Sequence, residues 1–222
     1  MGATIMKVLV CGVGSMGWNH ARVCSELGVL SGIVEPNEEL RNSVSDRFSV
    51  PGFDVLEEAV SKTSSTAVIV ATPSSTHFEV STKALQLGQH ILVEKPLCDN
   101  LEDARKLVSE AENRNLKLAV GHIERHNPAV TVVKEESSTN VWGRLLTISS
   151  KRASSRPVRI GDVGVILDLA IHDIDNSIYL AESIPTEVYT RGASFGNSEM
   201  EDFAQIFIGF EDGRTALVEV NW

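Results

Sequence analysis

The sequence is poor in cysteine, in cations and in long hydrophobic runs. Its three cysteines, Cys11, Cys24 and Cys98, form no CxxC pair, so they indicate neither a disulfide framework nor a metal site. Twenty Lys and Arg against 30 Asp and Glu leave a net charge of −10, which disfavours the counterion release that drives nucleic-acid binding. No apolar run is long enough to span a membrane, and the first residues lack the charged segment of a signal peptide. We therefore expect a cytoplasmic protein with no metal, nucleic-acid or membrane partner.

The first half of the chain alternates short apolar runs with helical patterns. The expected strands are residues 7–11, 31–34, 53–55, 67–71, 90–93 and 117–120. The expected helices lie between them and end near residues 27, 48, 62, 87 and 113. Asp99 is the expected N-cap of the last helix, with Glu102 at capping-box spacing. Strands that alternate with helices predict a doubly wound parallel sheet, which is the Rossmann arrangement.

The pattern changes after about residue 122. The expected helices are residues 126–136 and 164–180, and the expected strands are 143–153, 186–193, 203–210 and 215–220. The sequence Glu211-Asp212-Gly213 between the last two strands is a hairpin signal, and adjacent strands without intervening helices predict a mainly antiparallel sheet. We therefore predict an α/β protein with two domains, residues 1–122 and 123–222. The second domain is expected to be incomplete at its C-terminal end, because the chain stops at Trp222 within the predicted sheet.

A glycine-rich loop follows the first predicted strand. Gly12, Gly14 and Gly17 form the pattern G-x-G-x-x-G, with Ser15 and Met16 between the second and third glycines. Glycine at these places permits a tight turn and a close approach of the backbone to a pyrophosphate, and the helix N-terminus adds partial positive charge. The strand–loop–helix context favours dinucleotide binding over a simple turn, so we expect these five residues to contact a cofactor.

Glu35 stands at the end of the second predicted strand, 23 residues after Gly12. A carboxylate there accepts hydrogen bonds from both ribose hydroxyls and repels a 2′-phosphate, so the sequence favours NAD over NADP. A solvated acid at a strand end is the alternative interpretation. Arg41 weakens the preference, because an arginine nearby could pair with the phosphate of NADP.

The segment LDLAIHDID places a carboxylate and an imidazole on one helix face. Asp168 and His172 are four residues apart, and Asp175, three residues further, can join that face, whereas Asp173 points elsewhere. A carboxylate beside an imidazole fixes its tautomer and stabilises the imidazolium, which equips His172 to accept a proton. A solvated i,i+4 pair is the alternative.

Four motifs occur in the order CGVGSMG, ATPSSTH, VEKP and VGVILDLAIHDID. Together they resemble the glucose–fructose oxidoreductase and inositol dehydrogenase family, Gfo/Idh/MocA, over essentially the whole chain. The resemblance implies a dinucleotide domain followed by an α/β domain that serves the substrate and oligomerisation. It also implies hydride transfer between a sugar or cyclitol hydroxyl carbon and nicotinamide. A homodimer or homotetramer, paired through the exposed face of the second sheet, is implied as well.

The resemblance also places residues around the cofactor. It assigns Thr72, Pro73 and His77 to the loop that lies against the cofactor, and Glu94 and Lys95 to the end of a parallel strand. Open α/β sheets bind their ligands at such strand ends. The alternatives are a turn leading into a helix cap for the first group, and a surface ion pair for the second.

Catalysis is implied for Lys95, Asp168 and His172, around one reacting carbon. The lysine would hydrogen-bond the substrate hydroxyl and stabilise its developing negative charge, and the histidine, held by Asp168, would remove the proton. A dinucleotide-binding sensor without turnover is the alternative function, although a sensor need not keep these three residues.

The segment VGHIERHNPA resembles members of the family that act on nucleotide-linked amino sugars, such as UDP-N-acetylglucosamine 3-dehydrogenases. The resemblance implies that Arg125 and Asn127 line a sugar site, with Asp175 as a further substrate contact. A hinge followed by a helix start at Pro128 is the alternative. Four cations are further candidates for pairing with a substrate diphosphate, or for a solvated strand end: Lys151, Arg152, Arg156 and Arg159.

Overall fold

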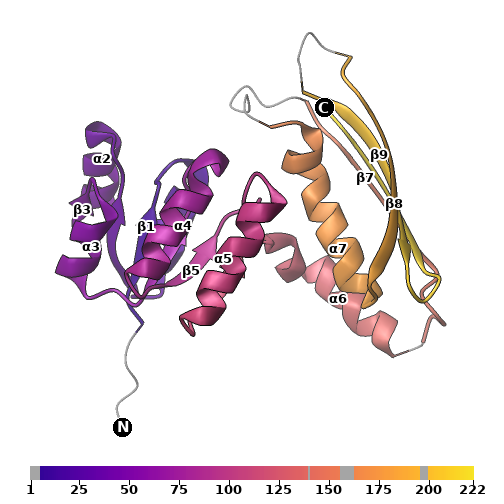
Figure 1. Cartoon of the computed structure of the whole chain (residues 1–222), viewed down its shortest axis with the longest axis horizontal. Coiled ribbons are helices and arrows are strands. Elements are labelled where there is room, and N and C mark those ends of the chain that lie inside the picture. Colours follow the sequence, from indigo (N-terminus) through magenta and orange to yellow (C-terminus); the bar gives the residue numbers. More distant parts are fainter. Residues whose placement is uncertain (1–5, 140, 156–162, 196–199) are drawn as a thin grey trace. The chain divides into compact units, whose positions relative to one another are not determined.

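The computed structural model describes residues 6–139, 141–155, 163–195 and 200–222. The chain packs into two compact units, Met1–Gly121 and His122–Trp222. Figure 1 shows the helices and strands of each unit. None of the helices in the described ranges is both long enough and apolar enough to cross a membrane.

The first unit is built on six parallel strands in the order β3-β2-β1-β4-β5-β6. The strands are β1 Val8–Cys11, β2 Leu30–Val34, β3 Gly52–Phe53, β4 Ala67–Val70, β5 His90–Val93 and β6 Leu118–Val120. Only β3 departs clearly from the predicted position, because it ends two residues early. Val55 already serves as the N-cap of the following helix, so the chain leaves the sheet after Phe53.

Helices connect these strands. Their bounds are α1 Ser15–Glu26, α2 Glu38–Phe48, α3 Leu56–Thr63, the 3₁₀ turn η1 Ser74–Thr76, α4 His77–Gln86 and α5 Leu101–Asn113. The predicted cap of α5 at Asp99 is wrong. Asn100 is the N-cap, because its backbone is extended and its side chain accepts a hydrogen bond from the N–H of Asp103 at 2.9 Å.

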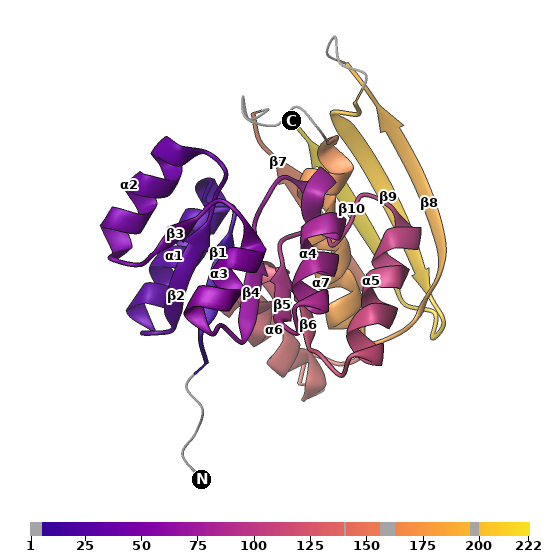
Figure 2. The ribbon, with the colours of Figure 1, turned by 60° about the vertical axis from the view of Figure 1, so that its left-hand side comes forward.

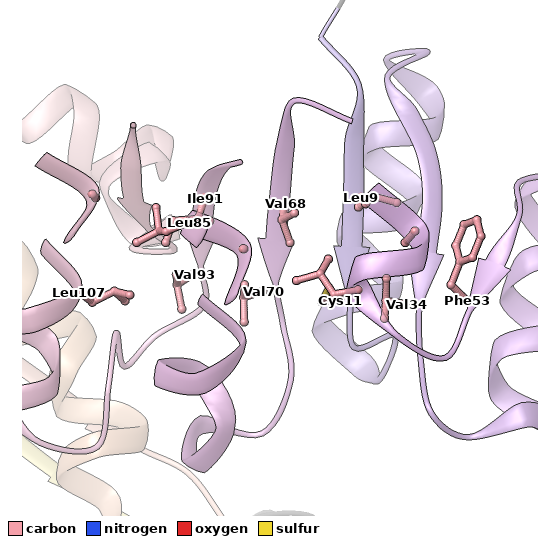
Figure 3. Packing of buried hydrophobic residues seen from close by; sticks show 14 residues of the cluster. Leu9, Cys11, Val34, Phe53, Val68, Val70, Leu85, Ile91, Val93 and Leu107 are labelled. Carbon is pink, nitrogen blue, oxygen red and sulfur yellow. The ribbon is translucent and has the colours of Figure 1, made fainter. Parts of the chain in front are cut away.

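Both faces of the parallel sheet are covered. One hydrophobic cluster joins the strands to α1 and α2, and a larger one joins them to α3, α4 and α5. Figure 3 shows the larger cluster, in which Leu85 of α4 and Leu107 of α5 lie beside strand residues such as Val93. Helices α4 and α5 contact each other and lie side by side in both views (Figures 1 and 2). Burial on both faces explains why these strands read as continuous apolar runs.

The second unit holds a four-stranded sheet in the order β7-β10-β9-β8. Its strands are β7 Thr147–Ala153, β8 Pro185–Ala193, β9 Phe203–Phe210 and β10 Thr215–Asn221. The pairs β8–β9 and β9–β10 are antiparallel, as predicted, and Gly213 turns the hairpin between the last two strands with a positive φ of 84°. However, β7 pairs parallel with β10, so the sheet is mixed.

The helices of the second unit are η2 Ile123–His126, α6 Pro128–Ser138, the π-helical turn η3 Ile166–Ala170 and α7 Ile171–Ala181. Helix α6 begins two residues later than predicted, because Pro128 occupies its first turn and Asn127 caps it. In Figure 1, α7 lies along one face of the sheet, and no described element covers the other face.

Candidate active site

The strand order of the first unit reverses between β1 and β4, and the loops after these two strands pack tightly together. Gly12 has a φ of +76°, and a Cβ added to it would lie 2.7 Å from the carbonyl oxygen of Ala71. A Cβ on Gly17 would lie 1.8 Å from the carbonyl oxygen of Gly12. The motif glycines at these two positions therefore close the strand–loop–helix turn at a place where ligands bind in such sheets.

The N-terminus of α1 is suited to an anion. No side chain caps it and no acidic residue lies in its first turn, whereas α2, α3 and α5 each carry two acidic residues there. Gly14, Ser15 and Met16 are exposed, and a Cβ on Gly14 would meet nothing within 4 Å. These backbone N–H groups and the helix dipole fit the pyrophosphate of a dinucleotide.

Glu35 lies beside the glycine loop. Its Oε2 accepts a hydrogen bond from the N–H of Val13 at 3.2 Å, and its Oε1 accepts one from the N–H of Asn37 at 3.0 Å. Arg41 donates from Nη1 to the carbonyl oxygens of Glu35, at 2.7 Å, and Pro36, at 3.1 Å. This arrangement commits Nη1 of Arg41 to backbone carbonyls and leaves the carboxylate as the charged group fixed against the loop, which fits the ribose of NAD.

A cavity of about 170 Å³ opens at this edge of the sheet. Its lining comes from Cys11, Gly12, Val34, Pro36, Asp54, Val55, Leu56, Glu57, Thr72, Glu79, Val80 and Lys83. Burial raises the pKa of Cys11 to about 12, so the thiol there is neutral. Glu57 and Lys83, which pair at 3.1 Å, are among the polar groups of a mainly apolar lining that fits the adenosine half of a dinucleotide. Sequence reasoning missed Asp54 to Glu57, although the strand-end rule applied to β3 could have found them.

His77 contacts the backbone of the loop after β4. The side chain of His77 is 1% exposed, its Nε2 lies 3.0 Å from the carbonyl oxygen of Thr72, and its Nδ1 lies 2.7 Å from that of Pro96. Thr72 itself lines the cavity, and the carbonyl of Pro73 accepts from Thr76 in the 3₁₀ turn. The structure thus places Thr72 in the lining of the cavity, and the buried ring of His77 in contact with both loops.

The Glu94-Lys95-Pro96 turn follows β5 directly, at the same sheet edge as the glycine loop. Glu94 is buried and its Oε1 lies 2.7 Å from Nε2 of His20, a residue of α1. Lys95 is half-buried, and the Lys95–Pro96 peptide bond is cis. Sequence reasoning missed His20, because a single histidine on a helix carries no signal until the fold brings it to the strand end.

In the second unit, Asp168 lies in the π-helical turn and His172 in the first turn of α7, and both are half-buried. Glu201, just before β9, holds the start of this helix. Its Oε1 accepts from the N–H of Ile166 at 3.0 Å, and a Cβ on Gly164 would lie 2.1 Å from the same oxygen. The glycine at the head of the motif thus makes room for a carboxylate at the helix N-terminus.

The other acids of α7 are paired with arginines. Asp175 is 9% exposed and accepts from Nε and Nη2 of Arg125 at 2.7 and 2.6 Å, with Nε2 of His122 at 3.7 Å. Hydrogen bonding to Asp175 raises the pKa of Arg125. Asp173 pairs with Arg152 at 2.8 Å, so it points away from Asp175 toward β7.

The remaining predicted substrate residues are partly engaged in local structure. Asn127 accepts from the N–H of Ala129 as the cap of α6 and donates to Glu124 at 3.1 Å. Lys151 pairs with Glu219 at 2.5 Å on the sheet. Arg156 and Arg159 lie outside the described residues. Within the described ranges, no group of three His, Cys, Asp or Glu side chains is placed to hold a metal ion.

Two family models match the chain. Residues 6–122 match the oxidoreductase family with an NAD-binding Rossmann fold, and residues 132–222 match the GFO/IDH/MocA C-terminal domain. The two matches correspond closely to the two compact units of the structure.

Curated relatives agree with this assignment. The chain is 31% identical over 211 residues to a UDP-N-acetylglucosamine 3-dehydrogenase of Acidithiobacillus ferrooxidans, a match that covers 95% of this chain and 65% of the relative. It is 27% identical over 233 residues to a scyllo-inositol 2-dehydrogenase (NAD(+)) of Bacillus subtilis, covering 97% of this chain and 67% of the relative. The chain therefore spans about two thirds of the length of these relatives.

Solved structures share the fold. The UDP-N-acetylglucosamine 3-dehydrogenase from Acidithiobacillus ferrooxidans superposes with a TM-score of 0.89 at 30% identity, covering 99% of this chain and 70% of that one. The WlbA dehydrogenase from Bordetella pertussis, solved with NADH and UDP-GlcNAcA, gives 0.89 at 21% identity, covering 98% and 72%, which supports the fold alone. The chain belongs to the GFO/IDH/MocA oxidoreductase family, and its first unit is an NAD-binding Rossmann domain.

Proposed function

We propose that the protein is an NAD-dependent dehydrogenase that moves a hydride between a sugar-type secondary alcohol and nicotinamide. The observation that carries this proposal is the position of Lys95. It follows β5 at the carboxyl edge of the parallel sheet, the edge that also holds the glycine loop and Glu35. A lysine presented there can reach a hydroxyl beside a bound dinucleotide. A protein that only binds the dinucleotide does not require a lysine at this place.

The cofactor assignment to NAD rests on one fixed carboxylate. Glu35 is oriented by two backbone N–H groups, and Arg41 donates to two backbone carbonyls. A ribose with free hydroxyls can hydrogen-bond to this carboxylate, whereas a 2′-phosphate would be repelled by it. The three cysteines are free, which is consistent with work in a reducing cytoplasm.

The chemistry divides between three side chains. Bound NAD supplies the hydride acceptor for the alcohol carbon. His172 takes the hydroxyl proton as general base, and Asp168, one helical turn before it, stabilises the resulting imidazolium. Lys95 donates a hydrogen bond to the hydroxyl oxygen and stabilises its negative charge as the carbonyl forms. The products are a ketone, a reduced cofactor and the proton left on His172.

The substrate we favour is a nucleotide-linked amino sugar, with a cyclitol as the runner-up. The chain is 31% identical to a relative named for UDP-N-acetylglucosamine and 27% identical to one named for scyllo-inositol. Arg125 is exposed, yet Asp175 holds its guanidinium in a bidentate pair. Such a pair orients an arginine for hydroxyl or phosphate oxygens, so we assign Arg125 to substrate contact, Asp175 to its support and Asn127 to the adjoining rim.

The second sheet offers a surface for pairing of subunits. Tyr189, Phe207 and Leu217 are adjacent in register on β8, β9 and β10, and they are 68%, 37% and 45% exposed. The next row on the same face carries Lys151 and Arg191 at its ends with Glu219 between them. An apolar row beside a row of mixed charge can pair with a second copy of itself, so we propose a homodimer or homotetramer.

Turnover assays test the proposal directly. Purified protein is incubated with NAD and a panel of UDP-sugars and inositols while NADH absorbance is followed. Lys95→Met and His172→Ala are each expected to lower kcat by about 10²–10⁴-fold while leaving the Kd for NAD nearly unchanged. Lys106→Met is the matched control, because that lysine lies exposed on α5 beside Glu102. Near-normal turnover in both variants would refute the site assignment, and NAD binding without turnover of any compound would indicate a sensor.

A further inference from the structure

Two histidines from different helices hold the Glu94-Lys95-Pro96 turn. His20 reaches the turn from α1, and its Nε2 lies 2.7 Å from Oε1 of Glu94. His77 reaches it from the first residue of α4, and its Nδ1 lies 2.7 Å from the carbonyl oxygen of Pro96. The two contacts fall on the residues immediately before and after Lys95.

Glu94 is a buried anchor with a defined charge. It is 7% exposed, its Oε2 accepts from the N–H of Lys95 at 3.2 Å, and a Cβ on Gly121 would lie 3.1 Å from its Oε1. Burial raises the pKa of Glu94, but the hydrogen bond and charge of His20, with the Lys95 N–H, outweigh burial and hold the pKa below its usual range. Glu94 is therefore a carboxylate at neutral pH, and a carboxylate requires an N–H on Nε2 of His20.

His77 anchors the other side. Its ring is 1% exposed, and besides Pro96 it contacts the carbonyl oxygen of Thr72 at 3.0 Å. Carbonyl oxygens only accept hydrogen bonds, and a neutral imidazole carries one N–H. The ring therefore donates to one of the two carbonyls and packs against the other, so it contacts both the loop after β4 and the turn after β5. We assign this buried ring to holding the backbone on both sides. The contact with the cofactor that the sequence predicts for His77 stays a prediction.

We propose that His20 and His77 form a clamp that sets the backbone on both sides of Lys95, and that both are positioning residues for catalysis. This inference deepens the proposed function and rests on it. A lysine side chain has four flexible carbons, so the position of its ammonium group depends on how well the backbone of that residue is fixed. Displacement of a catalytic group by about 1 Å can cost about 10²-fold in rate.

The first experiment separates positioning from general stability. His20→Leu removes the donor, whereas His20→Gln places an amide N–H the same number of bonds from Cα and can restore it. We expect His20→Leu to lower kcat about 10–100-fold with the Kd for NAD changed by less than about threefold, and His20→Gln to recover most of the loss. Arg22→Gln is the control, because Arg22 lies on the same helix in an exposed pair with Glu26. An unchanged kcat in His20→Leu, or a glutamine variant no better than the leucine one, overturns the clamp.

The two histidines should differ in one readout. Thr72 lines the cavity and is tied to His77, whereas His20 contacts Glu94. His77→Gln is therefore expected to lower kcat and also weaken NAD binding measured by calorimetry, while His20→Leu lowers kcat alone. Equal loss of NAD affinity in both variants would contradict separate anchoring of the two sides.

A third readout does not depend on turnover. The carboxyl carbon of Glu94 is titrated by ¹³C NMR in the wild type, His20→Leu and Arg22→Gln. His20 lowers the pKa of Glu94 and burial raises it, so loss of His20 is expected to move the Glu94 midpoint upward while Arg22→Gln leaves it in place. An unmoved Glu94 midpoint in His20→Leu refutes the clamp. Absence of turnover of any sugar by the wild type refutes the proposed function instead, and the titration can be read in either case.

Discussion

Glu35 is the side chain to which we assign the choice of cofactor. Its carboxylate is fixed by the N–H groups of Val13 and Asn37, so binding of the proposed ribose would not carry the cost of ordering this side chain. Glu35→Ala is expected to weaken NAD binding by about 1.5–3 kcal/mol, the range for hydrogen bonds to a charged group, and to narrow the gap between NAD and NADP. Calorimetric titration with each cofactor measures both effects. Glu39→Gln is the control, because that acid is exposed on the adjoining helix.

An unchanged ratio of NAD to NADP affinity in Glu35→Ala would contradict this role. The discrimination between NAD and NADP would then be assigned to the residues after β3 that line the cavity, such as Asp54.

Residues predicted from the sequence and residues missed by it differ in a physical way. The proposed roles of Gly12 and Glu35 depend on backbone conformation and on position at a strand end, and both leave a pattern along the chain. Arg41 could be interpreted either way until the fold brought its side chain against Gly52, where a Cβ would lie 2.8 Å from Arg41 Cγ. The proposed role of His20 depends on its contact with Glu94, which is 74 residues away in the sequence, and no local pattern predicts such a contact.

At the scale of elements, the start of the helical segment made of η3 and α7 depends on Gly164 and Glu201. The carboxylate of Glu201 occupies the space that a Cβ on Gly164 would need and accepts from the N–H of Ile166. Gly164→Ala is expected to displace it and lower the free energy of unfolding by about 1–3 kcal/mol, as overpacking does. Because the segment carries Asp168 and His172, turnover should fall as well. Urea denaturation and kcat measure the two effects.

A double-mutant cycle tests the stated cause. Glu201→Ala removes both the acceptor and the obstacle, so adding Gly164→Ala to it should cost much less than Gly164→Ala costs alone. Additive losses would mean that the alanine clashes with something other than Glu201. Glu201→Gln keeps the shape and the accepting oxygen, so it serves as the mild control.

The bounds of most elements follow from local signals, but their partners do not. A continuous apolar run predicts β5 to the residue, and a longer strand pattern predicts β9 to the residue, because burial on two faces or one is visible in the side chains. The parallel pairing of β7 with β10 and the π-helical turn at Ile166–Ala170 are absent from any local pattern. The first depends on which strand edge is available, which a single strand's sequence does not show.

The molecule as a whole divides into two units with separate hydrophobic cores. The change from strands alternating with helices to adjacent long strands marks this division in the sequence. The core of the second unit lies on the face of its sheet toward α7, with Val218 and Ile206 fully or nearly buried. The opposite face keeps its large apolar side chains exposed. The alternation of residues predicts two faces but not which one is covered, so an exposed face was implied only by the family resemblance.

This uncovered face leads to a prediction about assembly. If Tyr189, Phe207 and Leu217 meet a second copy, the wild type should have the mass of a dimer or tetramer by light scattering at micromolar concentration. Phe207→Asp places a charge at the centre of this row and is expected to shift the mass toward the monomer without lowering the Tm of the fold, since charges are depleted from interface cores. Leu101→Asp is the matched control, because Leu101 is 64% exposed at the start of α5 in the other unit. A monomeric wild type would refute pairing through this face, and an oligomer that survives Phe207→Asp would place the contact elsewhere.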